Sequence, residues 1–279
     1  MRFSVVIPVF NEETTISRCI SQLIQSSHDV EILVVDGGSH DATRQIARAT
    51  GARVLHSPAG RGPQMNIGAR ESSGTILVFL HADSIVPPVF FDFLSGQFSH
   101  PGLQFGAFRA LYEPDSFLLR VYSFFTQFES ALTTFGDQCF VMRREFFLSI
   151  GGFPEWPLFE DVEFLRRARK VTVVRKFHLQ IKTSARKFLN GGVVVQQLHN
   201  IVTMILFRLG VPPRRLYKRY YGRDLNDRGA STGTMGAESA VHHLREWDPV
   251  RQANPLANTD SARVGIGKPG EAADARRLD

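Results

Sequence analysis

The first part of the chain alternates between short apolar runs and segments with helical periodicity. The apolar runs are typical of buried strands and are bounded by polar or glycine-rich turns. Between them, apolar residues such as Ile16, Ile20 and Leu23 recur at the spacing of an amphipathic helix. We expect strands at residues 3–10 (FSVVIPVF), 30–36 (VEILVVD), 53–57 (RVLHS) and 75–83 (TILVFLHAD). This alternation predicts an α/β fold in which helices cover both faces of a parallel sheet.

Polar residues predict where the first helices begin and end. Asn11 is expected to cap the first helix, and either Ser39 or Asp41 the second, which Gly51 ends. A loop and a third helix are expected at residues 62–74. The second half is less regular. It predicts an antiparallel strand at 105–114, a helix within 117–135, a loop, strand and helix within 136–153, a charged helix at 159–170, a strand at 171–176 and an apolar helix at 193–210.

Composition changes after Tyr221. Residues 225–279 are rich in glycine, alanine, serine and charge and have no periodicity, so we expect a disordered tail after a domain at 1–224. The whole chain carries a formal net charge of +6. Seven basic and eight acidic residues fall in the tail, which leaves +7 on the domain. That excess favours an anionic partner, such as phosphate, nucleic acid or acidic lipid.

Other features of the sequence narrow the class of protein. The start, MRFSVVIPVFNEE, does not resemble a signal peptide, and no uninterrupted apolar run is long enough to predict a membrane-spanning helix. Cys19 and Cys139 are the only cysteines, which predicts buried thiols in a reducing cytoplasm rather than a disulfide framework. No RNA-recognition or helix-turn-helix signature is present, so nucleic acid is not an expected partner.

Polar residues follow three of the expected strands directly. Asn11 and Glu12 follow the first strand, Asp36 ends the second, and the fourth ends on His81 and Asp83. Each position alone is equally well explained by a turn or a cap. The carboxyl ends of parallel strands share one edge of the sheet, where ligands bind in such folds. The three positions together therefore predict one polar crevice.

Six motifs resemble those of a known family. They are SVVIPVFNEE, VVDGGSHDAT, GRGPQMNIGA, FLHAD, GDQCFVMRREFFLSIGGFP and FEDVEF, in this order. They resemble the family 2 glycosyltransferases, which have the GT-A fold, and the resemblance covers Arg2 to Asp224. GDQ, FEDVEF and TSARKF resemble a bacterial subgroup labelled arsenosugar-biosynthesis glycosyltransferases. The Gln-any-any-Arg-Trp motif of processive synthases is absent from the sequence, which favours transfer of a single sugar.

The resemblance implies roles for residues on the donor side. Asp36 matches the aspartate that contacts the base of the sugar nucleotide. Pro8, Phe10 and Glu12 match the first loop, which cradles the nucleotide, and Arg61 matches a basic position near it. The implied donor is a nucleoside-diphosphate sugar carrying UDP or GDP.

The resemblance also implies a metal site and a catalytic base. Asp83 matches the last aspartate of the family's Asp-any-Asp motif, so it would hold Mg²⁺ or Mn²⁺, which needs only one or two protein carboxylates beside the diphosphate. His81 replaces the first aspartate; it is a second ligand, a hydrogen-bond donor to phosphate, or a packing residue. Asp161 matches the base of inverting members, with Glu160 beside it. From the residues alone, ordinary capping of a helix explains this pair equally well.

Three further residues have two explanations each. Asp137 and Gln138 either position the acceptor or a sugar hydroxyl, or lie in a turn. Arg186 either clamps the diphosphate or lies in a solvated basic turn.

The expected function is metal-dependent, inverting transfer of one sugar to an acceptor hydroxyl of a small or lipid-linked molecule. The alternatives are a sugar-nucleotide-binding protein without transfer activity and, with less support, a basic nucleic-acid binder. Residues 193–223 join an apolar helix to a run of Arg, Lys and Tyr. This segment is either a core helix with a solvated basic end or a contact with the inner face of the membrane.

Overall fold

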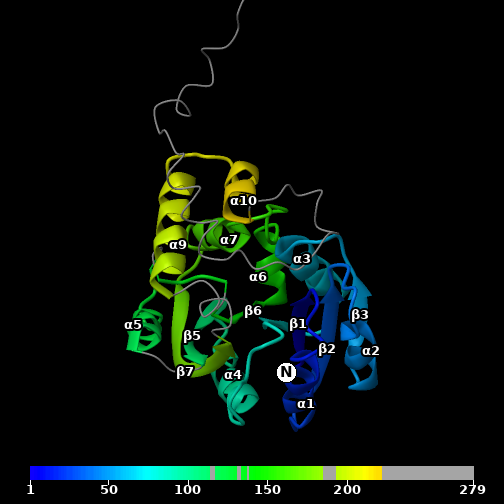
Figure 1. The fold of residues 1–279 in the computed structure, drawn as a ribbon. Helices are drawn as coiled ribbons and strands as arrows, with labels where there is room; N and C mark the ends of the chain where they lie inside the picture. The colour runs from blue at the N-terminus through cyan, green and yellow to red at the C-terminus, as the bar shows by residue number, and fades with distance from the viewer. Residues whose placement is uncertain (114–116, 131–132, 137, 185–192, 222–279) are drawn as a thin grey trace, which may run out of the picture.

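The computed structural model describes residues 1–113, 117–130, 133–136, 138–184 and 193–221. Its centre is a seven-stranded sheet in the order β3-β2-β1-β4-β6-β5-β7 (Figure 1). Among these strands only β6 runs antiparallel to its neighbours. The strands are β1 (Phe3–Val9), β2 (Val30–Asp36), β3 (Arg53–His56), β4 (Ile76–Phe79), β5 (Phe105–Glu113), β6 (Phe140–Arg143) and β7 (Val174–Ser184).

Helices cover both faces of the sheet, as the alternating pattern predicts. The described helices are α1 (Ile16–Ile24), α2 (Thr43–Ala49), α3 (Arg61–Glu71), α4 (Phe90–Phe98), α5 (Phe117–Phe125), α6 (Arg144–Ser149), α7 (Glu160–Ala168), α9 (Val193–Arg208) and α10 (Pro213–Tyr221). One core cluster joins α1, α2 and α4 to alternate residues of β1, among them Val5 and Ile7. A second cluster joins α3, α6 and α7 to the opposite face, where Val6 is buried. This division follows from the two-residue period of a strand.

The pairing of the strands brings their carboxyl ends together. Val9 of β1 lies opposite Asp36 of β2, and Asp36 lies opposite His56 of β3. On the other side of β1, Val6 lies opposite Phe79, just before His81 and Asp83. The predicted crevice therefore has a structural basis, because the polar residues after β1, β2 and β4 share one edge of the sheet.

Several expected boundaries were wrong. Asn11 does not cap α1, which begins at Ile16 and has Thr15 at its N-cap. At the second helix Ala42 is the N-cap, although Asp41 accepts the backbone N–H of Thr43 at 3.0 Å.

The second half also departs from expectation. The strand expected at 171–176 is β7, which begins at Val174 and continues to Ser184. The strand at 105–114 is antiparallel to β6, as expected, but parallel to β7. The helix expected within 117–135 ends at Phe125. The expected tail at 225–279 lies outside the described residues.

Candidate functional site

Asp36 anchors the turn that follows β2. Its side chain is fully buried, and its carboxylate accepts the backbone N–H groups of Gly38 and Ser39 at 3.2 and 3.1 Å. Arg44 Nε lies 3.9 Å from the same carboxylate. A buried carboxylate with these donors is held in one orientation at the carboxyl end of β2.

The loop after β1 is fastened to the turn after β2. Asn11 is held in the left-handed region at φ 53°, and its side chain accepts the N–H of His40 at 2.9 Å. The N–H of Asn11 in turn donates to Ser39 Oγ at 2.9 Å, and that of Glu12 to Thr43 Oγ1 at 2.8 Å. The Glu12 carboxylate accepts the Thr15 hydroxyl at 2.7 Å. The predicted nucleotide loop is therefore a preformed structure, braced by the neighbouring turn.

Gln64 is a site residue that sequence reasoning missed. It is buried in α3, and its Nε2 donates to Val9 O at 2.8 Å and to Val35 O at 2.7 Å. These bonds fix the ends of β1 and β2 relative to each other and to the helix that begins at Arg61. The signal available in the sequence was a polar amide within GPQMN, which did not reveal whether the side chain was exposed or buried.

Gly136 connects the two halves of the site through its backbone. His81 Nε2–H donates to the carbonyl oxygen of Gly136 at 2.8 Å. The N–H of Gly136 donates to Asp161 Oδ2 at 2.6 Å, a short bond of the kind that charged acceptors form. His81, which was expected near the metal, and Asp161, which was expected to be the base, thus bond to the two backbone groups of Gly136. Sequence reasoning did not single out Gly136.

Glu160 and Asp161 lie in the first turn of α7 and are both buried. Glu160 Oε1 lies 3.3 Å from Arg61 Nε, so the start of α3 meets the start of α7. Burial raises the pKa of Glu160 to about 7; the charge on Arg61 lowers it, and Asp161 raises it further. The carboxyl group is therefore poised to titrate near neutral pH, which is a property of many functional sites.

The residue before this pair has an unusual backbone. Phe159 precedes α7 with φ 64°, a left-handed conformation that is uncommon for a bulky residue. Its ring stacks on Phe207 of α9 at 4.5 Å between centroids, which helps to hold the entry to α7. Backbone strain of this kind is often concentrated at functional sites.

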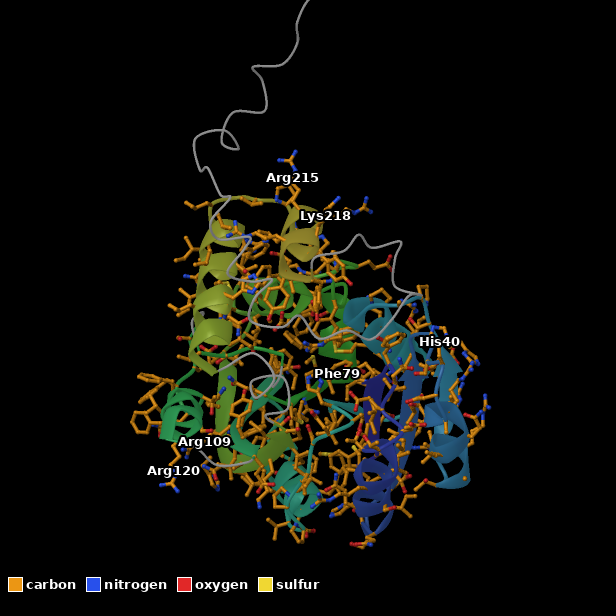
Figure 2. The ribbon with its side chains drawn as sticks, in the orientation of Figure 1. His40, Phe79, Arg109, Arg120, Arg215 and Lys218 are labelled. Atoms are coloured by element: carbon orange, nitrogen blue, oxygen red, sulfur yellow. The ribbon has the colours of Figure 1, made fainter. Side chains whose placement is uncertain are left out.

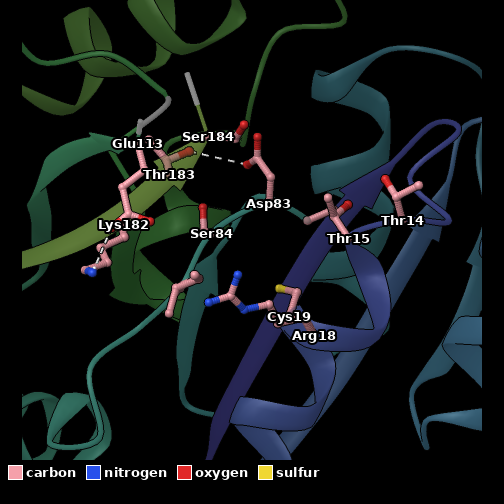
Figure 3. A pocket seen from close by; sticks show the side chains of 12 residues that line it. Thr14, Thr15, Arg18, Cys19, Asp83, Ser84, Glu113, Lys182, Thr183 and Ser184 are labelled. Atoms are coloured by element: carbon pink, nitrogen blue, oxygen red, sulfur yellow. Dashed lines mark hydrogen bonds and ion pairs between the residues drawn. The ribbon is translucent and has the colours of Figure 1, made fainter. Parts of the chain in front are cut away.

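Asp83 lies at the wall of a pocket of about 580 Å³. Figure 3 shows the Asp83 carboxylate beside Thr183, whose Oγ1 lies 3.3 Å from Asp83 Oδ1. The start of α1 contributes Thr15 and Arg18 to the same pocket, and β7 contributes Lys182. Lys182 Nζ is 2.7 Å from a carboxylate oxygen of Glu113. The pocket thus combines carboxylates, hydroxyls and cations.

The remaining predicted residues lie in different surroundings. Gln138 is fully buried, and its side chain bonds to Thr133 O and to Lys176 Nζ, so within the described residues it supports the loop before β6. Asp137 and Arg186 lie outside the described residues. Pro8 lies within β1, one residue before its end at Val9, and the Phe10 ring lies edge-on to His40 with 6.3 Å between ring centroids.

Two wider properties of the described chain bear on ligands. It contains no group of three or more His, Cys, Asp or Glu side chains placed to hold a metal ion by themselves. Cys19 and Cys139 are buried and free, as expected, and burial raises the pKa of Cys19 to about 12.

Comparison with known proteins accounts for this arrangement. The model for glycosyl transferase family 2 matches residues 4–148, just over half of the chain. The chain belongs to glycosyl transferase family 2. Among curated relatives, the glycosyltransferase AglE of Haloferax volcanii is 36% identical over 90 residues, which are 29% of this chain and 30% of AglE. The PGL/p-HBAD biosynthesis glycosyltransferase of Mycobacterium bovis is 30% identical over 159 residues, which are 54% of this chain and 51% of that protein.

Solved structures show that the family 2 chain has the GT-A fold, as the motifs predicted. Glucosyl-3-phosphoglycerate synthase from Mycobacterium tuberculosis superposes with a TM-score of 0.55 at 23% identity, over 76% of this chain and 81% of that one. TarS of S. aureus superposes with a TM-score of 0.56 at 14% identity, over 81% of this chain and 45% of TarS. The first curated relatives are matched over less than a third of their own length.

Proposed function

We propose that this family 2 chain transfers a single sugar from a nucleoside-diphosphate sugar to an acceptor hydroxyl, with inversion at the anomeric carbon. The observation that carries the proposal is the pair of hydrogen bonds at Gly136. They link Asp161, a buried carboxylate at the start of a helix, to the strand end that carries His81 and Asp83. The reaction requires a base for the acceptor hydroxyl and a place that binds the leaving diphosphate. In this proposal Gly136 joins the two.

The donor would lie along the carboxyl ends of β1, β2 and β4. Asp36 offers a fixed acceptor for donor groups of the base, and the braced loop at Pro8, Phe10 and Glu12 supplies the adjoining wall. Arg61, at the start of α3, places a cation on the path toward Asp83. The M. tuberculosis synthase with this fold has been crystallised with UDP-glucose and Mn²⁺, so UDP sugars are the first donors to test.

The residues around Asp83 fit Mg²⁺ or Mn²⁺ shared with the donor. Asp83 supplies a hard carboxylate oxygen at the edge of a pocket that also contains hydroxyl groups, and carboxylate plus phosphate oxygens are a typical ligand set for Mg²⁺. A bound cation would stabilise the negative charge that develops on the leaving diphosphate. The Nε2 proton of His81 is engaged by Gly136, so this nitrogen is not offered to a metal.

Asp161 would receive the proton of the acceptor hydroxyl. As the acceptor oxygen attacks the anomeric carbon from the face opposite the diphosphate, the bond from that carbon to the diphosphate breaks and the proton passes to a carboxylate oxygen of Asp161. The Gly136 N–H holds Oδ2 and so orients the carboxylate. Glu160 remains paired with Arg61, and this buried pair tunes the site rather than touching the acceptor.

The identity of the acceptor and the place of action belong to the same proposal. The acceptor is a small or lipid-linked alcohol, and the arsenosugar label of the resembling subgroup stays a prediction. The two free, buried cysteines agree with a reducing, cytoplasmic location. Within the described residues no helix combines the length and hydropathy needed to cross a bilayer.

The test of the proposal is turnover. We expect slow, Mn²⁺- or Mg²⁺-dependent release of nucleoside diphosphate when the protein is incubated with UDP or GDP sugars. Asp161→Asn should fold and bind donor, but should lose about 10²–10⁴-fold in rate, as is typical for removal of a general base. Binding of donor without any release by the wild type would instead support a non-catalytic sugar-nucleotide protein. A product that retains the anomeric configuration, seen by NMR, would exclude direct displacement.

A further inference from the structure

A buried carboxylate and a partly exposed cation meet where α3 and α7 begin. Both helices pack on the same face of the sheet (Figure 1). Glu160, the first residue of α7, is only 4% exposed, whereas the side chain of Arg61, the first residue of α3, is 40% exposed. Arg61 Nε lies 3.3 Å from Glu160 Oε1. The inner side of the guanidinium therefore faces a buried carboxyl group, and its outer side can meet a ligand.

The backbone around this pair is held firmly. The side chain of Asn66, in α3, donates to Phe153 O at 2.8 Å and accepts the N–H of Phe153 at 2.9 Å. Gly62, next to Arg61, packs so closely that an added Cβ would lie 2.5 Å from Pro154 O. The start of α3 is thus fixed against the segment that leads into α7, and the position of the guanidinium depends on the Arg61 side chain and the groups that hold it.

The guanidinium also adjoins the candidate base. A Cβ built on Gly136 would lie 2.5 Å from Arg61 Nη2 and 3.0 Å from Asp161 Oδ2. Arg61 therefore lies beside the peptide that bonds both Asp161 and His81. In the proposed function the donor diphosphate lies along this edge of the sheet, so its oxygens would approach the guanidinium from its exposed side.

Arg61 is the cation that balances Glu160 among the described residues. Burial is the largest cause acting on the pKa of Glu160 and raises it to about 7, while Arg61 from α3 lowers it and Asp161 from α7 raises it. A diphosphate beside Arg61 would share that cation and add negative charge. A buried carboxylate in such surroundings is neutralised by a proton, because an unbalanced charge is costly to keep away from water.

We propose that Glu160 positions Arg61 for the donor diphosphate and takes up a proton from the solvent when the donor binds. The inference rests on the proposed function, because it requires a nucleotide at this edge. The protonated carboxyl group still has a carbonyl oxygen that accepts an Arg61 N–H, so it continues to hold the guanidinium. Because Glu160 is then neutral, Arg61 interacts with the diphosphate in full, and Asp161 no longer has a second anion beside it. Two adjacent carboxyl groups in different protonation states suit a site in which one of them acts as the base.

Isothermal titration calorimetry of the full chain with UDP and saturating Mg²⁺ measures this proton directly. Titrations at pH 8 in Tris and in HEPES give the number of protons taken up, because the binding enthalpy then varies with the ionisation enthalpy of the buffer. A terminal phosphate has a second pKa of about 6, so UDP itself is already ionised at this pH. We expect the wild type to take up about half a proton or more, since most of the free protein has released the Glu160 proton at pH 8.

The pH dependence of affinity and two variants assign the proton to Glu160. Wild-type affinity for UDP should fall about tenfold from pH 7 to pH 8.5, because binding that takes up a proton weakens as the pH rises. Glu160→Gln should abolish the uptake at pH 8 and reduce the change in affinity to less than about twofold. Glu163→Gln is the matched control, since Glu163 also lies in the first turn of α7 but pairs with Arg166 at 2.7 Å. Its proton uptake should equal that of the wild type.

A second pair of variants tests the positioning role. Glu160→Ala should bind UDP about tenfold more weakly than Glu160→Gln, because neither has a charge at this position and only glutamine retains an oxygen that holds Arg61. In an Arg61→Ala background the two should bind alike, since the guanidinium to be positioned is gone. Arg215→Ala is the cation control. Figure 2 shows Arg215 of α10 pointing away from the body of the protein, so its loss should leave UDP affinity unchanged. An unchanged circular dichroism spectrum verifies that each variant folds.

UDP binding by the wild type without proton uptake at pH 8 would overturn this inference and leave the proposed transfer reaction intact. Uptake that persists in Glu160→Gln would assign the proton to another group. Equal affinities of Glu160→Ala and Glu160→Gln in the presence of Arg61 would show that Glu160 does not position the cation. If neither UDP nor GDP binds with Mg²⁺, the donor site of the proposed function is refuted, and this inference is refuted with it.

Discussion

Replacing Gly136 with alanine would test whether the backbone at this position holds Asp161, the carboxylate that we propose as the base. A Cβ at Gly136 would lie 2.8 Å from Asp161 Cβ, 3.0 Å from Asp161 Oδ2 and 2.5 Å from a terminal nitrogen of Arg61. The Arg61 side chain is 40% exposed and can swing away. Asp161 is buried in the first turn of α7, so its Cβ cannot move without shifting the helix. The alanine would therefore separate Gly136 from Asp161.

The size of the effect follows from the bond that is lost. The N–H of Gly136 donates to a carboxylate at 2.6 Å, and a hydrogen bond to a charged group contributes about 1.5–3 kcal/mol. If that energy serves to orient Asp161 in the transition state, the rate falls about 10- to 100-fold, since about 1.4 kcal/mol corresponds to a factor of ten. We expect the loss in kcat, with a smaller rise in donor KM from the displaced Arg61.

Steady-state kinetics on a double-mutant cycle makes this assignment specific. Gly136→Ala should cost about 10- to 100-fold in the wild type but little more in an Asp161→Asn background, because the two changes act on the same interaction. Gly96→Ala is the matched control, because an added Cβ there meets nothing within 4 Å. Equal losses in both backgrounds, or a loss below about threefold, would show that Gly136 does not act through Asp161.

Three other changes probe the neighbouring groups. Asp83→Asn should abolish detectable transfer. By calorimetry it should bind UDP more weakly than the wild type in Mn²⁺ but equally well in EDTA. Equal affinity of the variant and the wild type in Mn²⁺ would contradict a metal role. His81→Ala removes the hydrogen bond to the Gly136 carbonyl and should lower kcat about tenfold, while Mn²⁺-dependent UDP affinity persists. Loss of that affinity would instead show that His81 is a metal ligand. Burial raises the pKa of Glu160 to about 7. Above about pH 4.5 the folded state therefore keeps a proton that the unfolded state has released. Because unfolding then releases this proton, the stability of the fold decreases as the pH rises from about 4.5 to about 7. Glu160→Gln should flatten this decline in melting temperature, and an unchanged slope would assign it to other groups.

The sequence predicted the first half of the fold because its buried strands are short runs of mostly apolar residues. Most residues of β1, β2 and β4 are buried, and a polar residue lies at or two positions beyond the end of each: Asn11 after β1, Asp36 at the end of β2, and His81 after β4. Alternation with helices then implies parallel strands and one shared edge. Asp36, His81 and Asp83 could be placed together by that reasoning alone, without any knowledge of tertiary contacts.

The errors arose where a side chain or strand depends on a distant partner. Asn11 has the chemistry of a helix cap, but the turn after β2 lies beside it, and the side-chain oxygen Oδ1 of Asn11 accepts the N–H of His40 instead. β7 continues past Lys176 because it pairs with β5 as far as Ser184, and its buried and exposed residues alternate irregularly. In the sequence, the polar and charged residues at its exposed positions are typical of a loop. No local pattern reveals which edge of a sheet will pair with such a segment.

The position of Gly136 follows from the direction of β6. Parallel strands present only their carboxyl ends at the candidate site, so a segment that precedes a parallel strand would lie at the opposite edge of the sheet. β6 is antiparallel to both β4 and β5, so its amino end lies beside the carboxyl end of β4, where Phe79 is opposite Phe140. Gly136, a few residues before β6, is thereby brought level with His81. A glycine there has both its N–H and its carbonyl available, and it can approach α7 closely enough to bond Asp161. The reversal of β6 among the described strands thus explains how Gly136 comes to bond both His81 and Asp161 in the candidate site.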